Sequence, residues 1–404
     1  MARVLCVWEL GSDLGHLSHL RLPIAVALQL GHEVFLAARQ LDRIAAVMGD
    51  MPITCLQAPF KQVALAGDQA VFPSYTHLLA RQCFSGVDEL EMYLRAWRAL
   101  FDLVKPDIVL FEHSPTALIA ACGYGFKKVL VGNGFAIPPQ PLETGAPFAP
   151  FVNTPRTSEV LAGLRSDDAV LLAVINRALE RLGLVGLPTL ANIYGQADER
   201  FLMTLPVLDH FGPRPGQRYL GVEPPKARLA PAWPVGAGPK VFGYLHAFPS
   251  LENLLQDLRS ANVCALLHVR GLPPALREAY SGELICFTDQ LIDLSTVAEQ
   301  AAWVINHGNH NTLASFVRSG VPQLLIPLHQ EHLFAALNLV AQGCARMAYQ
   351  DQPGFAAEVT DLNSNPQIRL RAAQLSAQCP DLASLDAARH IARVLQTLLP
   401  SLSQ

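Results

Sequence analysis

The chain has 404 residues, a length that suits two domains of about 200 residues, each able to bury a full core. Hydrophobic residues make up 51% and charged residues 16%, but no stretch reaches the roughly 18 consecutive apolar residues that a membrane-spanning helix needs. The net charge of −4 leaves no basic surplus, so a nucleic-acid partner is not expected.

The N-terminus and the cysteines indicate the compartment. The first ten residues read as a buried strand and lack the cleavage site of a signal peptide, so no leader is expected. The eight cysteines are scattered, and no C-x-x-C pair occurs. This usage is typical of free thiols in a reducing environment, and we expect a cytoplasmic protein.

Short apolar runs alternate with helical patterns along the chain. In the first half, strands are expected at 3–10, 32–38, 107–113 and 127–134, and helices at 20–31 and 115–125. In the second half, strands are expected at 239–248, 263–269, 283–287, 301–308 and 322–328, and helices at 250–260, 311–320 and 384–399. The alternation predicts an α/β protein with two doubly wound, Rossmann-like parallel sheets.

Composition also predicts the domain boundaries. Residues 213–238 are dense in Pro and Gly without apolar periodicity, which is the pattern of a linker. We therefore expect an N-terminal domain over 1–212, a C-terminal domain over 239–380 and a closing helix within 381–404. Region 139–160 is also Pro-rich and is expected to be a long loop. Two such domains predict a central ligand cleft at the carboxyl ends of their sheets.

The first candidate site follows the first strand, in "ELGSDLGHLSHL". The strand is expected to end near Leu10 and a helix to begin around Ser18, with Gly11 and Gly15 allowing a tight turn between them. His16 would then lie at the carboxyl end of the strand, where a neutral imidazole can take a proton from a hydroxyl. The alternative is that His16 only caps the helix or packs in the loop.

A histidine base works better when a carboxylate holds its other ring nitrogen. Glu112 is the candidate, because it ends the strand "PDIVLFE" and acidic residues are disfavoured in buried strands. His113 is next to it, but successive side chains of a strand point to opposite faces, so only one of the two should face the site. An exposed loop carboxylate remains the alternative for Glu112.

The second candidate site is "VINHGNHNTLASF", residues 304–316. A strand, a turn and a helix N-terminus in succession form an anion site, because free backbone amides and the helix dipole attract phosphate oxygens. His307, Asn311 and Thr312 would add side-chain donors. The alternative is an ordinary capped helix.

Two H-x-x-H pairs, His307/His310 and His329/His332, raise the question of a zinc site. The first pair straddles the expected turn, no cysteine lies nearby, and the pairs follow different strands. No metal is therefore expected.

The order and spacing of these motifs resemble the GT-B nucleotide-sugar glycosyltransferases of the UDP-glycosyltransferase type, which include bacterial macrolide, glycolipid and natural-product glycosyltransferases. "GHLSHLRLPIAVALQLGHEV" resembles their opening motif, and "PDIVLFE" resembles the strand that ends on their aspartate. "VINHGNHNTLASFVRSGVPQLLIPLHQEH" resembles their donor signature. The resemblance covers nearly the whole chain and is loose over 139–230.

The resemblance implies an inverting, metal-independent transfer of a sugar to an acceptor hydroxyl. The donor substrate would be a nucleotide-diphosphate sugar, UDP- or dTDP-linked, and no cofactor is implied. By position, His16 would be the catalytic base and Glu112 the acid that orients it. The donor diphosphate would be bound by His307, Gly308, Asn309, Asn311 and Thr312, and the donor sugar by Glu331 and His332.

The departures from the family pattern concern the donor. Asn309 replaces the second Gly of the turn and, since Asn tolerates a left-handed backbone, would preserve it. Ser315 replaces a ribose-binding Glu, His332 replaces a Gln and Ala335 replaces an Asn. His246 lies in a segment that replaces a Gly-Ser donor loop. These changes predict a retained phosphate cradle with altered ribose and sugar contacts, and therefore an unusual donor such as a deoxysugar nucleotide, or lost activity.

Acceptor pockets in this family come from N-terminal loops, here 61–77 and 133–151. Their Phe, Pro and Ala content predicts a small or lipid-like, apolar acceptor and allows a peripheral membrane contact. Phe135, Phe148 and Phe151 would line this pocket, or else only anchor the loop.

The loss of the family's Glu at Ser315 and of its Asn at Ala335 leaves two alternative functions open. One is a non-catalytic GT-B protein that binds a ligand or activates a partner enzyme, and the other is a sugar-nucleotide epimerase. The retained His16 and the diphosphate turn favour an active transferase.

Overall fold

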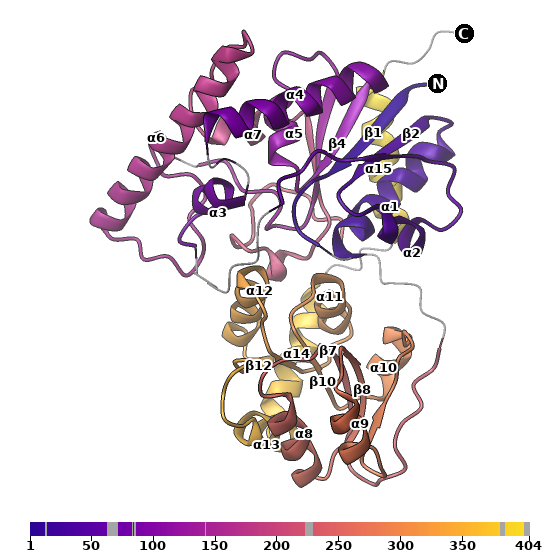
Figure 1. Ribbon diagram of the computed structural model, residues 1–404. Coiled ribbons are helices and arrows are strands. Elements are labelled where there is room, and N and C mark those ends of the chain that lie inside the picture. The colour runs from indigo at the N-terminus through magenta and orange to yellow at the C-terminus, as the bar shows by residue number, and fades with distance from the viewer. Residues whose placement is uncertain are drawn as a thin grey trace. The chain divides into compact units, whose positions relative to one another are not determined.

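The computed structural model of the chain describes residues 1–12, 14–62, 72–82, 84, 86–141, 143–222, 229–379 and 384–399. These residues form two compact units, each with its own sheet (Figure 1). The first unit comprises Met1–Thr204, Asp209–Glu223 and Leu382–Gln404, and the second comprises Leu205–Leu208 and Pro224–Asp381.

The first unit is built on a six-stranded parallel sheet in the order β3-β2-β1-β4-β5-β6. Its strands are β1 (Arg3–Trp8), β2 (Glu33–Ala38), β3 (Thr54–Gln57), β4 (Ile108–Glu112), β5 (Lys127–Gly132) and β6 (Glu199–Leu202). Its helices are α1 (Leu14–Gln29), α2 (Ile44–Met48), α3 (Tyr75–Gln82), α4 (Val87–Val104), α5 (Pro115–Ala120), α6 (Ser158–Arg181), α7 (Ala191–Gly195) and α15 (Ser384–Leu398). The strand order reverses between β1 and β4, which makes this the switch point of a doubly wound sheet.

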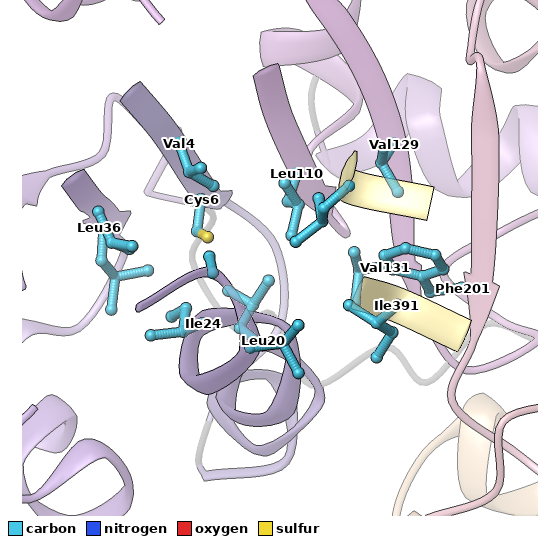
Figure 2. Packing of buried hydrophobic residues seen from close by; sticks show 14 of the residues in the cluster. Val4, Cys6, Leu20, Ile24, Leu36, Leu110, Val129, Val131, Phe201 and Ile391 are labelled. Atoms are coloured by element: carbon cyan, nitrogen blue, oxygen red, sulfur yellow. The ribbon is translucent and has the colours of Figure 1, made fainter. Parts of the chain in front are cut away.

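One face of this sheet packs against α1, α2 and α15. Val4 and Cys6 of β1 and Leu110 of β4 point to this face, two residues apart along each strand as the pleat requires. In Figure 2, Leu20 of α1 and Ile391 of α15 belong to the same cluster, and Ile391 lies beside Val131 of β5 and Phe201 of β6. The alternate residues of these strands are equally buried on the other side, which is why the strands read as continuous apolar runs in the sequence.

The second unit repeats the plan, with a parallel sheet in the order β12-β11-β10-β7-β8-β9. Its strands are β7 (Lys240–His246), β8 (Cys264–Arg270), β9 (Ile285–Phe287), β10 (Trp303–Asn306), β11 (Gln323–Leu325) and β12 (Ala345–Met347). Its helices are α8 (Leu251–Ser260), α9 (Pro274–Tyr280), α10 (Leu294–Gln300), α11 (His310–Arg318), α12 (Gln330–Ala341), α13 (Ala356–Ser364) and α14 (Pro366–Gln378). Its switch point lies between β7 and β10.

The predicted fold class, two doubly wound parallel sheets, is confirmed. The division between the units falls at residues 223–224, and α15 packs against α1 in the first unit. The predicted loop at 139–160 overlaps the start of α6, which begins at Ser158. Residues 63–71 of the expected acceptor loop and 223–228 of the expected linker lie outside the described residues.

One expected boundary was wrong. The first helix begins at Leu14, not around Ser18, so His16 lies in its first turn rather than in a loop. Gly15 lowers helix propensity in the sequence, but the first turn of a helix contains few internal hydrogen bonds, so a glycine costs little there.

Within the described residues, no helix is both long and apolar enough to cross a membrane. The seven cysteines described all have free thiols.

Candidate functional site

Both candidate sites predicted from the sequence lie at switch points. In the first unit, His16 follows β1 and Glu112 ends β4, the two strands between which the order reverses. In the second unit, His307 follows β10 and His246 ends β7, the corresponding pair. Ligands of open α/β sheets bind at the carboxyl ends of the strands at this point.

The position of Glu112 follows from strand geometry. Ile108 and Leu110 point to the face that α1 covers, so Glu112, two residues further along β4, points there as well. Glu112 is paired in register with Trp8 of β1. Its side chain is fully buried, so the alternative of an exposed loop carboxylate is wrong.

His16 reaches this carboxylate from the first turn of α1. Its Nδ1 lies 2.9 Å from Oε2 and 3.0 Å from Oε1 of Glu112. An ionised carboxylate only accepts hydrogen bonds, so Nδ1 of His16 is the donor, and in the neutral ring Nε2 is left as the proton acceptor. The His16 ring also stacks on Trp8, with ring centroids 5.4 Å apart.

Gly11 makes room for the ring of His16. The backbone of Gly11 has φ +85°, a left-handed conformation, and a Cβ at this position would overlap Nε2 of His16. A glycine is therefore required here for two reasons, the turn and the space.

The structure adds His19, which the sequence reasoning did not single out. Its Nδ1 lies 3.1 Å from Oε1 of Glu112, and its side chain is buried. His16 and His19 are three residues apart on α1 and therefore share one face of the helix. The spacing H-x-x-H in "GHLSHL" is the signal that could have revealed it.

The carboxylate remains ionised although it is buried. Burial raises the pKa of Glu112, but the charge and hydrogen bond of His16, with smaller contributions from His19, lower it to about 2. Buried acids without such partners shift the other way, so this site is built to keep a negative charge.

A series of ring contacts leads from His16 through His113 to the three phenylalanines predicted to line the acceptor pocket. His113 has a left-handed backbone, φ +40°, and its ring lies 5.6 Å from that of His16 and 5.9 Å from that of Phe135. Phe135 stacks on Phe151 at 5.6 Å, and Phe148 meets Tyr75 edge-on at 6.1 Å.

All three phenylalanines are at most 5% exposed, so in this conformation they pack inside an aromatic cluster. The loop that carries them is tied to α6, because the backbone amide of Phe148 donates to Asp168 at 2.7 Å. The anchoring role is therefore visible in the structure, whereas the acceptor role stays a prediction.

The turn between β10 and α11 is organised by Asn306. Its buried side chain accepts a hydrogen bond from the amide of Gly308 at 2.8 Å and donates one to Gln323 at 2.8 Å. Gly308 has φ +93°, so the left-handed position of the turn is a glycine. The first amide that is bonded back within α11 is that of Leu313, to Asn309 at 2.9 Å. The preceding amides of the first turn form the anion-attracting end of the helix.

His307 differs from the expectation that its side chain is a phosphate donor. Its Nδ1 donates to the carbonyl of Ile326 at 2.7 Å, and its Nε2 accepts the backbone amide of His246 at 2.8 Å. Burial lowers the pKa of His307 to about 4, so the ring is neutral. In this conformation His307 joins the ends of three neighbouring segments through their main chains.

Asn309 has φ −53°, and Gly308 provides the left-handed conformation, so the turn is kept without using the tolerance of Asn for that backbone. Asn311 and Thr312 lie in the first turn of α11. Ser315 donates its hydroxyl to the carbonyl of Asn311 at 2.8 Å, one turn earlier in the same helix.

Helix α12 packs closely against the turn between β10 and α11. A Cβ at Gly308 would lie 3.2 Å from the Cβ and carbonyl oxygen of His332, so the two backbones approach closely. The rings of His332 and His329 have centroids 3.6 Å apart and are tilted by 34°, and Glu331 lies in the first turn of α12. The structure therefore brings His332 to the turn of Gly308, and Glu331 precedes it in α12.

A cavity of about 320 Å³ lies at the carboxyl end of β8. Its lining comprises His268, Val269, Arg270, Gly271, Leu272, Arg277 and Asp289. Arg270 is paired in register with His246 of β7, and β7 is in turn paired with β10. The cavity is thus two strands away from the turn of His307, a spacing of about 10 Å.

Metal-ligating side chains gather in the first unit. Among the described residues, the group of three that could hold a metal ion is His16, His19 and Glu112, with ligand atoms within 4.8 Å of one another. Neither of the H-x-x-H pairs in the second unit belongs to such a group of described residues.

Comparison by sequence gives a local match. No protein-family model matches the chain. Over 87 residues the chain is 34% identical to O-mycaminosyltylonolide 6-deoxyallosyltransferase of Streptomyces fradiae. This match spans 20% of the chain and 21% of that protein.

Comparison by structure covers almost the entire chain. The glycosyltransferase SnogD from Streptomyces nogalater matches 98% of this chain and 99% of its own, with a TM-score of 0.65 and 18% identity. The calicheamicin glycosyltransferase CalG4 matches 99% of both chains, with a TM-score of 0.69 and 15% identity. The glycosyltransferase VinC, solved with dTDP, matches 97% of this chain and 100% of its own, with a TM-score of 0.65 and 16% identity. The chain therefore has the two-unit GT-B fold of these glycosyltransferases.

Proposed function

We propose that the protein is an inverting glycosyltransferase that moves a sugar from a nucleoside-diphosphate donor to a hydroxyl of an apolar natural product. The observation that carries the proposal is the contact between the partly buried His16 ring and the fully buried Glu112 carboxylate at the switch point of the first unit. A protein that only binds a ligand has no need of an imidazole held by a buried, ionised carboxylate. The neighbouring GT-B transferases support the reaction class.

The reaction is a single displacement. Nε2 of His16 takes the proton of the acceptor hydroxyl as its oxygen bonds to the anomeric carbon. The bond between that carbon and the donor diphosphate breaks, and the leaving diphosphate keeps the electron pair. Glu112 stabilises the imidazolium that forms. Attack from the side opposite the leaving group inverts the anomeric centre.

The donor is assigned to the second unit. The N-terminus of α11, with Gly308, Asn309, Asn311 and Thr312, would receive the diphosphate through backbone amides and short polar side chains. His307 would act by holding this turn in place. The cavity at the end of β8, about 10 Å away, fits the nucleoside of the same donor. Glu331 and His332 would contact the sugar.

We propose transfer without a metal ion, since the helix N-terminus supplies positive charge to the leaving diphosphate. A dTDP-deoxysugar is the favoured donor. VinC was solved with dTDP and SsfS6 of Streptomyces sp. SF2575 with thymidine diphosphate, and the curated relative is named as a deoxyallosyltransferase. A UDP-sugar is the next choice.

The acceptor is assigned to the first unit. The aromatic cluster of Phe135, Phe148 and Phe151 continues from His16 through His113, so an apolar acceptor is favoured over a charged one. We place this activity in the cytoplasm, where free thiols such as those of the described cysteines persist.

A second candidate function is a non-catalytic protein that binds a nucleotide. Ser315 favours it, because its hydroxyl is bonded within its own helix rather than being a bidentate acceptor for a ribose.

A thermal-shift screen of the purified protein against dTDP, UDP, GDP and ADP tests the donor assignment. A ligand at about 100 times its dissociation constant adds roughly 2.7 kcal/mol of folding stability, and we expect dTDP to give the largest shift. His307→Ala should reduce that shift. No shift with any of the four would contradict the donor site.

A transfer assay follows with the matching donor. We expect a product of inverted anomeric configuration, at a rate unchanged by EDTA. Nucleotide binding without transfer to any of a panel of apolar acceptors, unchanged by His16→Ala, would support the non-catalytic protein instead.

A further inference from the structure

We propose that His19 is a positioning residue of the base site, fixing the Glu112 carboxylate so that His16 is held by a His–Glu–His arrangement rather than by a pair. The inference rests on the proposed function. The catalytic residue remains His16, which meets the acceptor hydroxyl; His19 acts through Glu112.

The two histidine rings contact the Glu112 carboxylate in different ways. His16 Nδ1 is 3.0 Å from Oε1 and 2.9 Å from Oε2, so it lies midway between the two oxygens. A single donor in this position does not stop the carboxylate from rotating about the line that joins Nδ1 to the carboxylate carbon. His19 Nδ1 contacts Oε1 alone, at 3.1 Å. The two rings are almost perpendicular, with an interplanar angle of 87°. The second donor therefore removes the rotation that the first one permits.

The length of Glu112 makes a second donor necessary. A glutamate has one more rotatable bond than an aspartate and loses more conformational freedom when it is held in place. The carboxylate is fully buried, where a lost hydrogen bond to a charged group is costly. Both histidines come from one face of α1, so a single helix sets both donors at once.

The tautomers follow from the same contacts. Because the carboxylate can only accept, both Nδ1 atoms carry protons. When His16 takes a proton from the acceptor, Glu112 must already point at its Nδ1 for the imidazolium to be stabilised. His19 contributes this orientation and need not change its own protonation.

Two amide substitutions separate positioning from packing. The side-chain nitrogen of Asn lies close to the place of a histidine Nδ1, whereas that of Gln lies close to Nε2. Since His19 donates through Nδ1, His19→Asn keeps a donor to Glu112 and His19→Gln misplaces it. His19→Leu removes the donor altogether. His32→Asn, in the loop before β2, is the matched control.

The experiment compares kcat and KM of these four variants with the unaltered protein. We expect His19→Leu and His19→Gln to lower kcat by about 10²-fold with KM for donor and acceptor unchanged, because a small displacement of the base is enough for such a loss. His19→Asn should recover most of this rate, and His32→Asn should keep all of it. Full activity in His19→Leu, or equal losses in the Asn and Gln variants, would overturn the inference.

A second measurement works without any substrate. With 15N-histidine labelling, the Nδ1–H proton that His16 shares with Glu112 gives a downfield NMR signal. This signal should keep its position in His19→Asn and shift or broaden in His19→Leu, while both variants retain their dTDP-induced thermal shift. An unmoved His16 signal in every variant would overturn the inference even if no sugar transfer were found.

Metal analysis completes the test. A cation held by the Nδ1 atoms of His16 and His19 would displace both protons. Stoichiometric zinc in the purified protein, lost in His19→Leu together with activity, would replace the positioning role by a ligand role. We expect no zinc and no effect of EDTA on the NMR signal.

Discussion

The two switch points hold their histidines in opposite ways. In the first unit, two imidazoles meet one buried carboxylate, and the pKa of Glu112 falls to about 2, with His16 the strongest of the partners that overcome burial. In the second unit, His307 meets only main-chain groups, and burial lowers its pKa to about 4. Burial is similar at the two sites, so the partner decides whether charge survives.

This difference assigns different tasks to the same residue type. A histidine held by an ionised carboxylate can accept a proton and be stabilised as a cation, which suits a base. A neutral histidine with both nitrogens bonded to main chain cannot accept a proton without breaking a hydrogen bond. Such a residue suits a structural role, in which it holds an anion-binding turn in place.

Glu112→Gln should produce the largest loss. It removes the charge that stabilises the His16 imidazolium and places an amide where both histidines need an acceptor, so we expect kcat to fall by about 10³-fold or more. Glu33→Gln, at the amino end of β2, is the control and should keep full activity. Equal rates for both variants would show that the carboxylate does not act on the base.

Gly11→Ala should be nearly as damaging. The added Cβ would overlap Nε2 of His16 and strain a left-handed backbone, and a displaced base costs about 10²-fold in kcat. Gly15→Ala is the matched control, because a Cβ there meets nothing within 4 Å and Ala favours the helix. If Gly11→Ala were as active as Gly15→Ala, the position of the His16 ring would not matter for transfer.

Gly308→Ala should weaken the binding of nucleoside diphosphate. The residue has φ +93°, and its Cβ would press on His332 at 3.2 Å, so the turn at the start of α11 must shift. We expect at least a tenfold rise in Kd for dTDP by calorimetry, roughly 1.4 kcal/mol. Gly282→Ala, in open space in the same unit, should bind normally.

The two units should respond to acid in different pH windows. The folded pKa of His307 is depressed, so its neutral form contributes stability that is present above about 6.5 and lost as pH falls towards 4, up to about 3 kcal/mol. The corresponding loss at Glu112 comes lower, as pH falls from about 4.5 towards 2. Denaturation of the unaltered protein and of His307→Gln between pH 7 and 4 measures the first window. If the free energy of unfolding changed with pH equally in the two proteins, the claim that His307 is neutral and structural would be contradicted.

The fold could be predicted because its signal is repeated. Buried parallel strands such as 3–8 and 303–306 are continuous apolar runs between helical patterns, and that alternation survives without tertiary information. The start of α1 at Leu14 was missed because Gly15 lowers helix propensity, whereas the first turn tolerates it.

The sites were predicted less completely, because side-chain partners depend on packing. Alternation along β4 was enough to bring Glu112 towards α1, and His16 was found from its place after β1. His19 was missed although its spacing from His16 was visible, because nothing in the sequence shows that the carboxylate accepts two donors. The main-chain contacts of His307 and the left-handed position of Gly308 were not predicted, because the sequence does not show which main-chain groups face a ring or which residue of a turn takes that conformation.

The central claim is that His16 performs chemistry while the donor binds elsewhere, and His16→Ala tests it most directly. The measurement is the rate of sugar transfer together with the Kd for dTDP in this variant, with His32→Ala as control. We predict that transfer falls by about 10² to 10⁴-fold while Kd stays within about twofold. Transfer at the unaltered rate, or a loss of dTDP binding as large as the loss of transfer, would contradict the assignment.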